Sequence, residues 1–310
     1  MINFNFNHFF KHKLRDSVAN LKMTFNAEKR YKEYDGGHRY ISSPVDYETV
    51  FEDRFKSRFN TAEWGYGQPW GQIHPGDLGQ YYDTEGECTY VTKNDGLALE
   101  LRKKPKKWIK AEMNEWQQSD EMEDEFTVDV CVGLIHSKES WRYGWFEASI
   151  KLPEGQAYWP AFWLSGAHSW PPEIDIFEAY SHEGPKYDKP RFFKWFSRPN
   201  QRIQPNLHYG SIEKGTKSMY GPRNIPVADA TDRFVQYACL WEEDRIEIYY
   251  DGIKVFQCTD PKILETYNAS DSHQFIILNH GLHHGHPDNP DESAMLVKNV
   301  IVKQKRRYDL

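Results

Sequence analysis

From about residue 45 onward, short segments rich in Val, Ile, Tyr, Phe and Trp recur between turn residues. In Phe146–Leu152 every second side chain is apolar, the pattern of a strand with one buried face. Long helical periodicity is scarce, and many short strands predict an all-β sandwich or barrel. The clearest expected strands are Leu97–Leu101, Phe126–Ile135, Trp145–Leu152, Phe234–Trp241, Ile246–Tyr250, Phe275–Leu278 and Met295–Val302.

Residues 1–40 differ in composition from the remainder, because they are rich in Asn, Lys and Phe. We expect an amino-terminal arm with a short helix from about Asp16 to Tyr34, joined to the rest by Asp35–Gly37. Such an arm would be a tether or a docking segment for a larger assembly. Residues 41–310 contain no internal repeat or low-complexity linker and are predicted to form one β domain.

Charge and hydropathy exclude several classes of partner. The 310 residues include 39 Lys plus Arg and 46 Asp plus Glu, so the net charge of −7 argues against nucleic acid as the main ligand. No run of about 18 apolar residues predicts a membrane span. The amino terminus also lacks the charged and then apolar regions of a secretory signal peptide. Aromatic residues nevertheless make up 15% of the chain, which indicates a folded protein with rings available for packing or for a groove.

The cysteines and histidines match no specific metal site. No CxxC pair is present, and a hairpin around Asp251–Gly252 would put Cys258 opposite Arg245 and away from Cys239. We therefore expect free, mostly buried thiols at Cys88, Cys131, Cys239 and Cys258. A second cluster is interpreted as a polar cleft rim rather than a metal site, and it comprises His280, His283, His284, His286, Asp288 and Asp291.

The most informative segment is Glu173–Tyr180, which has the β-branched content of a strand. On a regular strand Glu173 and Asp175 share one face, while Glu178 would point into the core with the isoleucines. An unpaired carboxylate there would be very costly. A β-bulge at Ile176–Phe177 would return Glu178 to the face of the other two acids.

Three carboxylates on one face repel one another, so at least one keeps a proton near neutral pH. A retaining glycosidase needs this asymmetry, with one ionised carboxylate to attack and one protonated carboxyl to release the leaving oxygen. An exposed strand face with three solvated acids is the alternative interpretation of the same pattern. Trp159, Trp163 and Trp170 stand close to the acids in sequence, and rings of this kind stack on sugars, which favours a carbohydrate cleft.

The ordered set of motifs resembles glycoside hydrolase family 16, the group of laminarinases, lichenases, agarases, porphyranases and κ-carrageenases. Glu173–Glu178 matches the bulged form of its ExDxxE signature, and the resemblance covers roughly residues 48–303. The other matching segments are Phe51–Phe55, Gly133–Lys138, Tyr143–Pro153, Trp159–Leu164, Tyr237–Trp241, Ile246–Gly252 and Phe275–Asn279. The chain departs from the family at Trp145 and Ser149, where Arg is frequent.

The resemblance implies a β-jelly-roll sandwich of two antiparallel sheets with a concave substrate cleft, so that 41–310 would be the catalytic domain. It implies that Glu173 is the nucleophile, Asp175 the assisting acid and Glu178 the general acid/base. The loop Arg191–Arg198 mixes cations with rings, and it would either meet an anionic sugar or pack on itself. The residues expected to bind substrate are Trp159, Trp163, Trp170, His208, Trp195, Arg191 and Asn279.

The expected activity is endo-acting, retaining hydrolysis of a β-1,3- or β-1,4-linked glucan or galactan. A non-catalytic carbohydrate-binding or adhesin module and a transglycosylase are the alternatives on the same fold. No cofactor is expected: many family members hold a structural calcium through an Asp of the last strand, where Lys298–Asn299 stand here. A polysaccharide substrate implies a location outside the cell, on its surface or on a virion.

Overall fold

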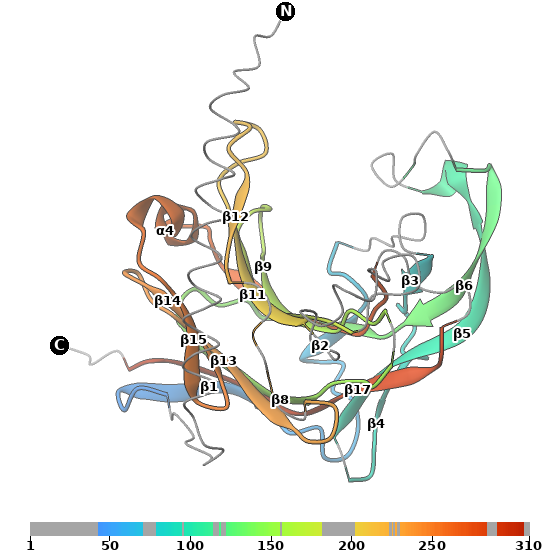
Figure 1. Ribbon diagram of the computed structural model, residues 1–310, viewed down its shortest axis with the longest axis horizontal. Helices are drawn as coiled ribbons and strands as arrows, with labels where there is room; N and C mark the ends of the chain where they lie inside the picture. The colour runs from blue at the N-terminus through green and yellow to red at the C-terminus, as the bar shows by residue number, and fades with distance from the viewer. Residues whose placement is uncertain are drawn as a thin grey trace, which may run out of the picture.

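The computed structural model describes residues 43–70, 79–94, 96–113, 118, 122–155, 157–181, 202–222, 225, 227, 230–283 and 290–306. Residues 1–40, for which the arm is predicted, lie outside this part. The described residues form two curved sheets packed face to face, as the jelly-roll prediction required (Figure 1). None of the helices described is long and apolar enough to cross a membrane.

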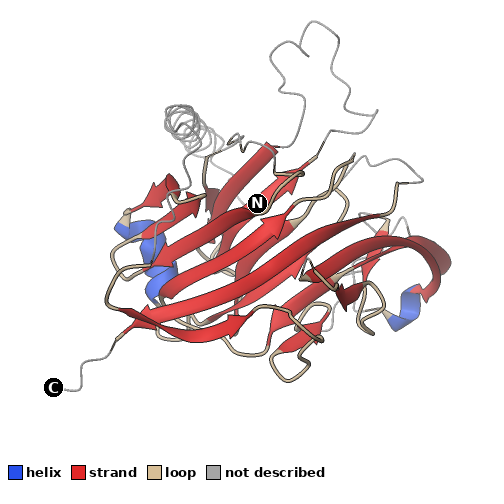
Figure 2. Ribbon diagram, turned by 90° about the horizontal axis from the view of Figure 1, so that it is seen from below, coloured by secondary structure: helices blue, strands red, loops and turns tan. Residues whose placement is uncertain are grey.

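The larger sheet follows the order β15-β14-β13-β8-β17-β5-β6-β3, with β1 paired to β17 and β4 to β5. Its strands run side by side across the lower face of the molecule (Figure 2). Neighbouring strands are antiparallel apart from β3, which pairs with β6 in parallel, a departure from the expected antiparallel sheets. The strands are β1 (Tyr47–Asp53), β3 (Gln80–Tyr82), β4 (Thr89–Val91), β5 (Leu97–Ile109), β6 (Glu125–Val132), β8 (Gly144–Lys151), β13 (Val235–Trp241), β14 (Ile246–Tyr250), β15 (Ile253–Cys258) and β17 (Ser293–Lys305).

The smaller sheet follows the order β12-β11-β10-β9-β16-β7-β2, and every pair in it is antiparallel. In the part of the chain that the structure describes, two short helices accompany the sheets, the 3-10 turn η1 (Lys110–Glu112) and α4 (Pro261–Asn268). The strands are β2 (Trp64–Tyr66), β7 (Leu134–Ser137), β9 (Ala161–Gly166), β10 (Glu173–Tyr180), β11 (Arg202–Tyr209), β12 (Ser218–Tyr220) and β16 (Gln274–Asn279).

The two-residue alternation of β8 decides which of its side chains enter the core. Phe146, Ala148 and Ile150 are fully buried and belong to the largest apolar cluster, which also takes residues from the smaller sheet. Glu147 and Ser149 between them remain half-exposed on the outer face. The predicted one-sided burial of this segment is confirmed, and it leaves an outward polar row on the larger sheet.

The segment Phe126–Ile135 was predicted to be one strand. It forms two strands in different sheets. β6 ends at Val132 and β7 begins at Leu134, so the chain crosses between the sheets at Gly133. The Gly133 amide donates to the Glu100 carbonyl on one side, and its carbonyl accepts from the His280 amide on the other. A Cβ at Gly133 would lie 2.6 Å from the Cys88 carbonyl oxygen, so this crossing needs glycine.

The four cysteines are free and buried, as predicted. Cys258 lies opposite Ile246 rather than Arg245, because a bulge between Ile248 and Tyr249 shifts the hairpin register by one residue. The eight-residue helix α4 was not predicted, since two turns carry little periodic signal. It begins after Asp260, whose side chain accepts a hydrogen bond from the Lys262 amide.

Candidate active site

The predicted bulge in β10 is present. Against β11, Asp175 pairs with Asn206 and Glu178 with Gln204, so β10 carries one extra residue in this interval. The register against β9 slips between Asp175 and Phe177 as well. Both residues of the bulge, Ile176 and Phe177, are fully buried in the core. Glu178 is thereby turned to the same outer face as Glu173 and Asp175.

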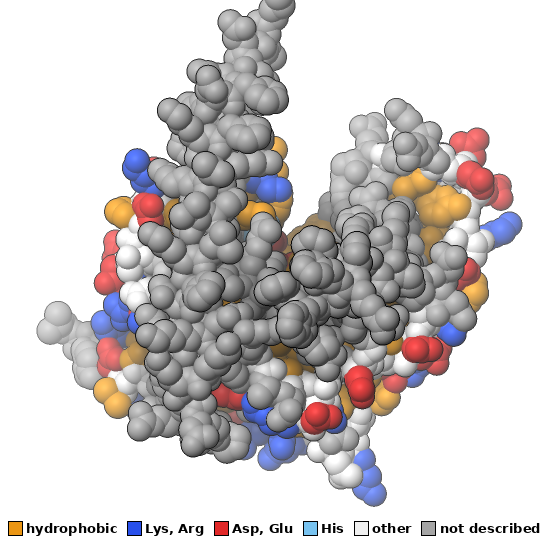
Figure 3. Space-filling view, viewed as in Figure 1, with side chains coloured by type: hydrophobic (Ala, Val, Ile, Leu, Met, Phe, Trp, Pro, Cys, Tyr) orange, Lys and Arg blue, Asp and Glu red, His pale blue; other side chains and the backbone are white. Residues whose placement is uncertain are grey.

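The carboxylates lie in the middle of the smaller sheet, with β11 on one side and β9 on the other. This sheet curves upward between β12 and the far ends of β5 and β6, and the space-filling view is hollowed between these two walls (Figures 1 and 3). Because strand partners share a face, side chains line up across the sheet in rows. One row passes through Asp175 and contains Asn206, Asp175, Trp163, Ile277 and His136.

Glu178 is held by three donors. Its Oε1 accepts hydrogen bonds from Trp159 Nε1 at 3.0 Å and from the Tyr180 hydroxyl at 2.9 Å. Its Oε2 accepts one from Asn206 Nδ2 at 2.5 Å. The Trp159 and Tyr180 rings stack on each other with centroids 5.6 Å apart. The orientation of this carboxyl is therefore determined by side chains from β10 itself, from β11 and from the loop before β9.

Glu173 and Asp175 share one histidine. Nε2 of His208 lies 3.2 Å from Glu173 Oε1 and 3.2 Å from Asp175 Oδ2. The other oxygen of Glu173 accepts a 2.8 Å hydrogen bond from Trp170 Nε1. His208 stands opposite Glu173 on β11, so the strand pairing itself places the imidazole.

Burial dominates the electrostatics of these two acids. Loss of solvation, with the nearby charge of Asp175, raises the pKa of Glu173 to about 8, although His208 and Trp170 oppose the rise. Loss of solvation, with the charge of Glu178, holds the pKa of Asp175 well above its ordinary value. The cluster therefore carries at least one proton at neutral pH, as the repulsion argument predicted.

Two tyrosines hold the backbone beneath the acids. The hydroxyl of Tyr267, on α4, lies 2.9 Å from the Glu173 carbonyl and 2.8 Å from the His208 carbonyl. The Tyr250 hydroxyl donates to the carbonyl of Ile176 inside the bulge at 3.0 Å. Both tyrosines are fully buried, so they fix the two strands from the core side.

Most of the predicted binding residues of the described chain lie near the acids. Trp159 and Trp170 bond to Glu178 and Glu173, and Trp163 Nε1 donates to Asn279 Oδ1 at 2.8 Å. Arg191 and Trp195 lie outside the described residues. Sequence reasoning missed four residues, of which Asn206 and Tyr180 carried a signal because each stands two positions from a recognised residue on the same strand. The four are Tyr180, Asn206, Tyr250 and Tyr267.

The expected polar rim around His280 is wrong for the histidines that the structure describes. His280 is fully buried and His283 is 7% exposed. Burial lowers the pKa of His280 to about 3, so its ring is neutral, bonding to Ser293 Oγ and to the Gly281 amide. His284, His286 and Asp288 lie outside the described residues.

The last strand does not fit calcium. The Lys298 ammonium lies 5.4 Å from the centre of the Phe234 ring, and Asn299 Oδ1 already accepts a hydrogen bond from the Ser149 amide. A lysine cation opposes a divalent cation at this position. Within the described residues, one group of three side chains has metal-ligand spacing, and it consists of Glu173, Asp175 and His208 of the carboxylate cluster.

Known proteins share both the fold and the sequence pattern. In the solved structure of a non-specific endo-β-1,3(4)-glucanase of family 16, 94% of that chain matches 86% of this one, with 26% identity and a TM-score of 0.62. A glucan endo-1,3-β-glucosidase of Cryptopygus antarcticus is 27% identical over 255 residues, which cover 74% of this chain and 86% of the relative.

Two further relatives are much longer than the matched part. The endo-1,3-1,4-β-glycanases ExsH and EglC of Rhizobium meliloti are 29% and 27% identical over 43% and 58% of this chain. The matches cover only 25% and 32% of these relatives. The family model of the glycosyl hydrolases family 16 matches residues 79–294, well over half of the chain. With the bulged carboxylate strand on a two-sheet sandwich, this match shows that the chain belongs to glycosyl hydrolase family 16.

Proposed function

We propose that the protein is an endo-acting, retaining β-glycosidase that hydrolyses internal β-1,3 or β-1,4 bonds of a polysaccharide. The observation that carries the proposal is the bulge in β10, which collects Glu173, Asp175 and Glu178 on one face beside three tryptophans. A binding module needs the rings but has no use for a row of buried acids, since their desolvation is unfavourable.

In the proposed reaction Glu173 is the nucleophile. Its carboxylate attacks the anomeric carbon while Glu178 gives a proton to the leaving glycosidic oxygen, so the bond to the leaving sugar breaks as the ester to Glu173 forms. Glu178, now ionised, takes a proton from water, and the resulting hydroxide equivalent attacks the anomeric carbon and releases Glu173. Two inversions at one carbon give net retention of configuration.

Asp175 and His208 would favour the ionised form of Glu173. In the free site the raised pKa values of Glu173 and Asp175 keep a proton between them. A proton on Asp175 lets that carboxyl donate to Glu173 or His208, which favours the ionised form of the nucleophile. The His208 Nε2 atom lies 3.2 Å from an oxygen of each acid, so the imidazole bridges the two carboxyl groups.

The substrate we propose is a β-glucan, with a galactan as the second choice. The named activities of the matched relatives are directed at β-1,3 or mixed β-1,3-1,4 glucan bonds. A variant of the structural relative was crystallised with 1,3-β-D-cellobiosyl-glucose at its active site. Trp159, Trp163 and Trp170 would stack on glucose rings on both sides of the acids, and the open row across the sheet suits an internal segment of a polymer.

A polymer of this kind places the proposed activity outside the cell, on its surface or on a virion. We also propose that residues 1–40 are a tether or docking segment and that no cofactor takes part. The carboxyl chemistry described above requires none.

The test is hydrolysis of laminarin, lichenan, agarose and carrageenan by the full chain, followed by reducing-sugar assay and product sizing. Glu173→Gln and Glu178→Gln are each expected to lower kcat by at least about 1000-fold, because each removes a proton-transfer or nucleophilic group. Glu265→Gln, an exposed carboxyl on α4, is the matched control and should keep full activity. Full activity in either cluster variant would reject the assignments, and products longer than the starting oligosaccharide would identify a transglycosylase.

A further inference from the structure

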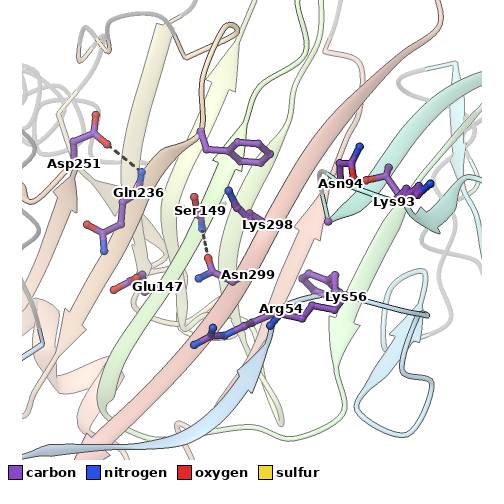
Figure 4. Close-up of a pocket in the computed structure, with 14 residues that line it drawn as sticks. Arg54, Lys56, Lys93, Asn94, Glu147, Ser149, Gln236, Asp251, Lys298 and Asn299 are labelled. Atoms are coloured by element: carbon purple, nitrogen blue, oxygen red, sulfur yellow. Dashed lines mark hydrogen bonds between the residues drawn. The ribbon is translucent and has the colours of Figure 1, made fainter.

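The outer face of the larger sheet carries a pocket of about 590 Å³ (Figure 4). The carboxylates lie on the other sheet, on the opposite side of the sandwich. Strands β8, β13 and β17 form the floor of the pocket, and the loops after β1 and β4 form its rim. Its volume lies in the range of small-ligand sites. The catalytic proposal makes no use of this face.

The floor is a row of uncharged polar side chains set by strand register. Ser149 on β8 pairs with Gln236 on β13 and with Asn299 on β17, so the three side chains lie side by side. Asn299 Oδ1 accepts from the Ser149 amide, which leaves its Nδ2 facing the pocket with the Ser149 hydroxyl and the Gln236 amide group. Such donors and acceptors suit the hydroxyl groups of a sugar.

The ring of Phe234 forms one wall beside this row. Phe234 stands two residues before Gln236, and Lys298 Nζ lies 5.4 Å from its ring centre. β17 is bulged between Val297 and Asn299, which turns Lys298 toward the ring. A sugar has an apolar face that packs against a phenyl ring while its edge meets polar groups.

Basic side chains surround the pocket. Lys56, Lys93 and Lys298 line it, and within the described part of the chain none of the three has a carboxylate partner. Arg54 also lines it and pairs with Glu52. In the space-filling view, Lys and Arg side chains are interspersed with Asp and Glu side chains along the lower edge of the molecule (Figure 3).

Two acids are among the described residues that line the pocket, and both already accept hydrogen bonds. Asp251 pairs with Arg233 at 2.6 Å and accepts a hydrogen bond from the backbone amide of Gln236. Glu147 accepts a hydrogen bond from Trp145 Nε1 at 2.9 Å. Among the described lining residues the four cations Arg54, Lys56, Lys93 and Lys298 outnumber these two acids, although the net charge of the chain is −7. A local reversal of sign favours an anionic ligand.

We propose that this pocket is a second saccharide-binding site, which holds a carboxylated or sulfated segment of an acidic polysaccharide. The polar row and the Phe234 ring meet the sugar, and Lys56, Lys93 and Lys298 meet its anionic groups. The proposal rests on the proposed function only in taking the ligand to be a polysaccharide. Binding here would hold the enzyme on a matrix in which acidic and neutral chains are mixed.

The test uses the full chain with Glu173→Gln, so that no substrate is consumed, and titration calorimetry at low salt. The probes are oligogalacturonates for a carboxylated sugar, κ-carrageenan oligosaccharides for a sulfated sugar, and laminari-oligosaccharides as the neutral probe. In this Glu173→Gln background, the double substitution Lys93→Gln and Lys298→Gln is expected to weaken binding of the tighter-binding acidic probe about 10-fold or more. Binding of the neutral probe should not change. The matched control adds Lys107→Gln with Lys262→Gln, two exposed lysines away from the pocket, and should change neither.

Gln236→Ala separates sugar recognition from simple charge attraction. It should weaken the acidic oligosaccharide at least about 3-fold while leaving binding of an oligothymidylate of equal charge unchanged. Failure of both acidic probes to bind, equal losses in both lysine pairs, or tighter binding of the oligothymidylate would overturn the proposal. Hydrolysis of laminarin by the chain with its native Glu173 tests the proposed function separately, because none of these pocket residues touches the carboxylates.

Discussion

Trp159 Nε1 donates a 3.0 Å hydrogen bond to Glu178 Oε1, and this contact joins the wall of the site to its proposed general acid. Trp159→Phe keeps a ring but removes the donor. We expect kcat/KM to fall about 10- to 100-fold, because the lost bond would stabilise the negative charge that Glu178 gains as it gives up its proton. Steady-state kinetics on laminarin measures it. Trp145→Phe is the control, because Trp145 Nε1 donates a matching 2.9 Å hydrogen bond to Glu147 on the larger sheet, away from the acids. Equal losses in the two variants would contradict the expectation.

The raised pKa of Glu173 makes folding stability depend on pH. Between the ordinary carboxyl value of 4.5 and about 8, the folded protein keeps a proton that the unfolded chain has released. Stability should therefore fall as pH rises through that window. Glu173→Gln removes the contribution and should raise the midpoint of thermal unfolding at pH 8 by a few degrees, but hardly at pH 4.5. Calorimetry from pH 4 to 9 checks this, and an equal gain at both ends would count against it.

His208 and Asp175 act on Glu173 in opposite directions. Burial is the largest cause of the raised pKa of Glu173, and the charge of Asp175 raises it further, whereas His208 lowers it. The acid limb of kcat/KM should move to higher pH in His208→Gln and to lower pH in Asp175→Asn, with lower maximal rates in both. Measuring kcat/KM from pH 4 to 10 locates the acid limb of each variant. Shifts of the same sign would show that the electrostatic coupling has been misjudged.

The predicted arm can be removed. We expect residues 41–310 alone to keep the fold and kcat/KM of the full chain within about twofold, because the carboxylates and those of their partners that the structure describes lie at or beyond Trp159. Circular dichroism and laminarin hydrolysis measure both properties. A truncated chain that folds but loses activity would show that the arm takes part in the site.

Much of the catalytic strand was predictable because a carboxylate is too costly to bury unpaired. Five positions separate Glu173 from Glu178, so a regular strand would have buried one of them, and the sequence alone required a bulge. The same reasoning could have found Asn206, which precedes His208 by two positions and faces the same way. It could not find Tyr267, since that residue sits on a short unpredicted helix and reaches the site only across the sandwich.

By itself, the sequence determined the sandwich class, the three acids and the side of β10 on which they lie, because these follow from local alternation and from the cost of a buried charge. Only the tertiary structure decided that the chain changes sheets at Gly133, that His208 touches two acids, and that Gln236, Ser149 and Asn299 form one polar row. Each of these depends on pairing between strands far apart in the chain, and register between such strands leaves no periodic trace in the sequence.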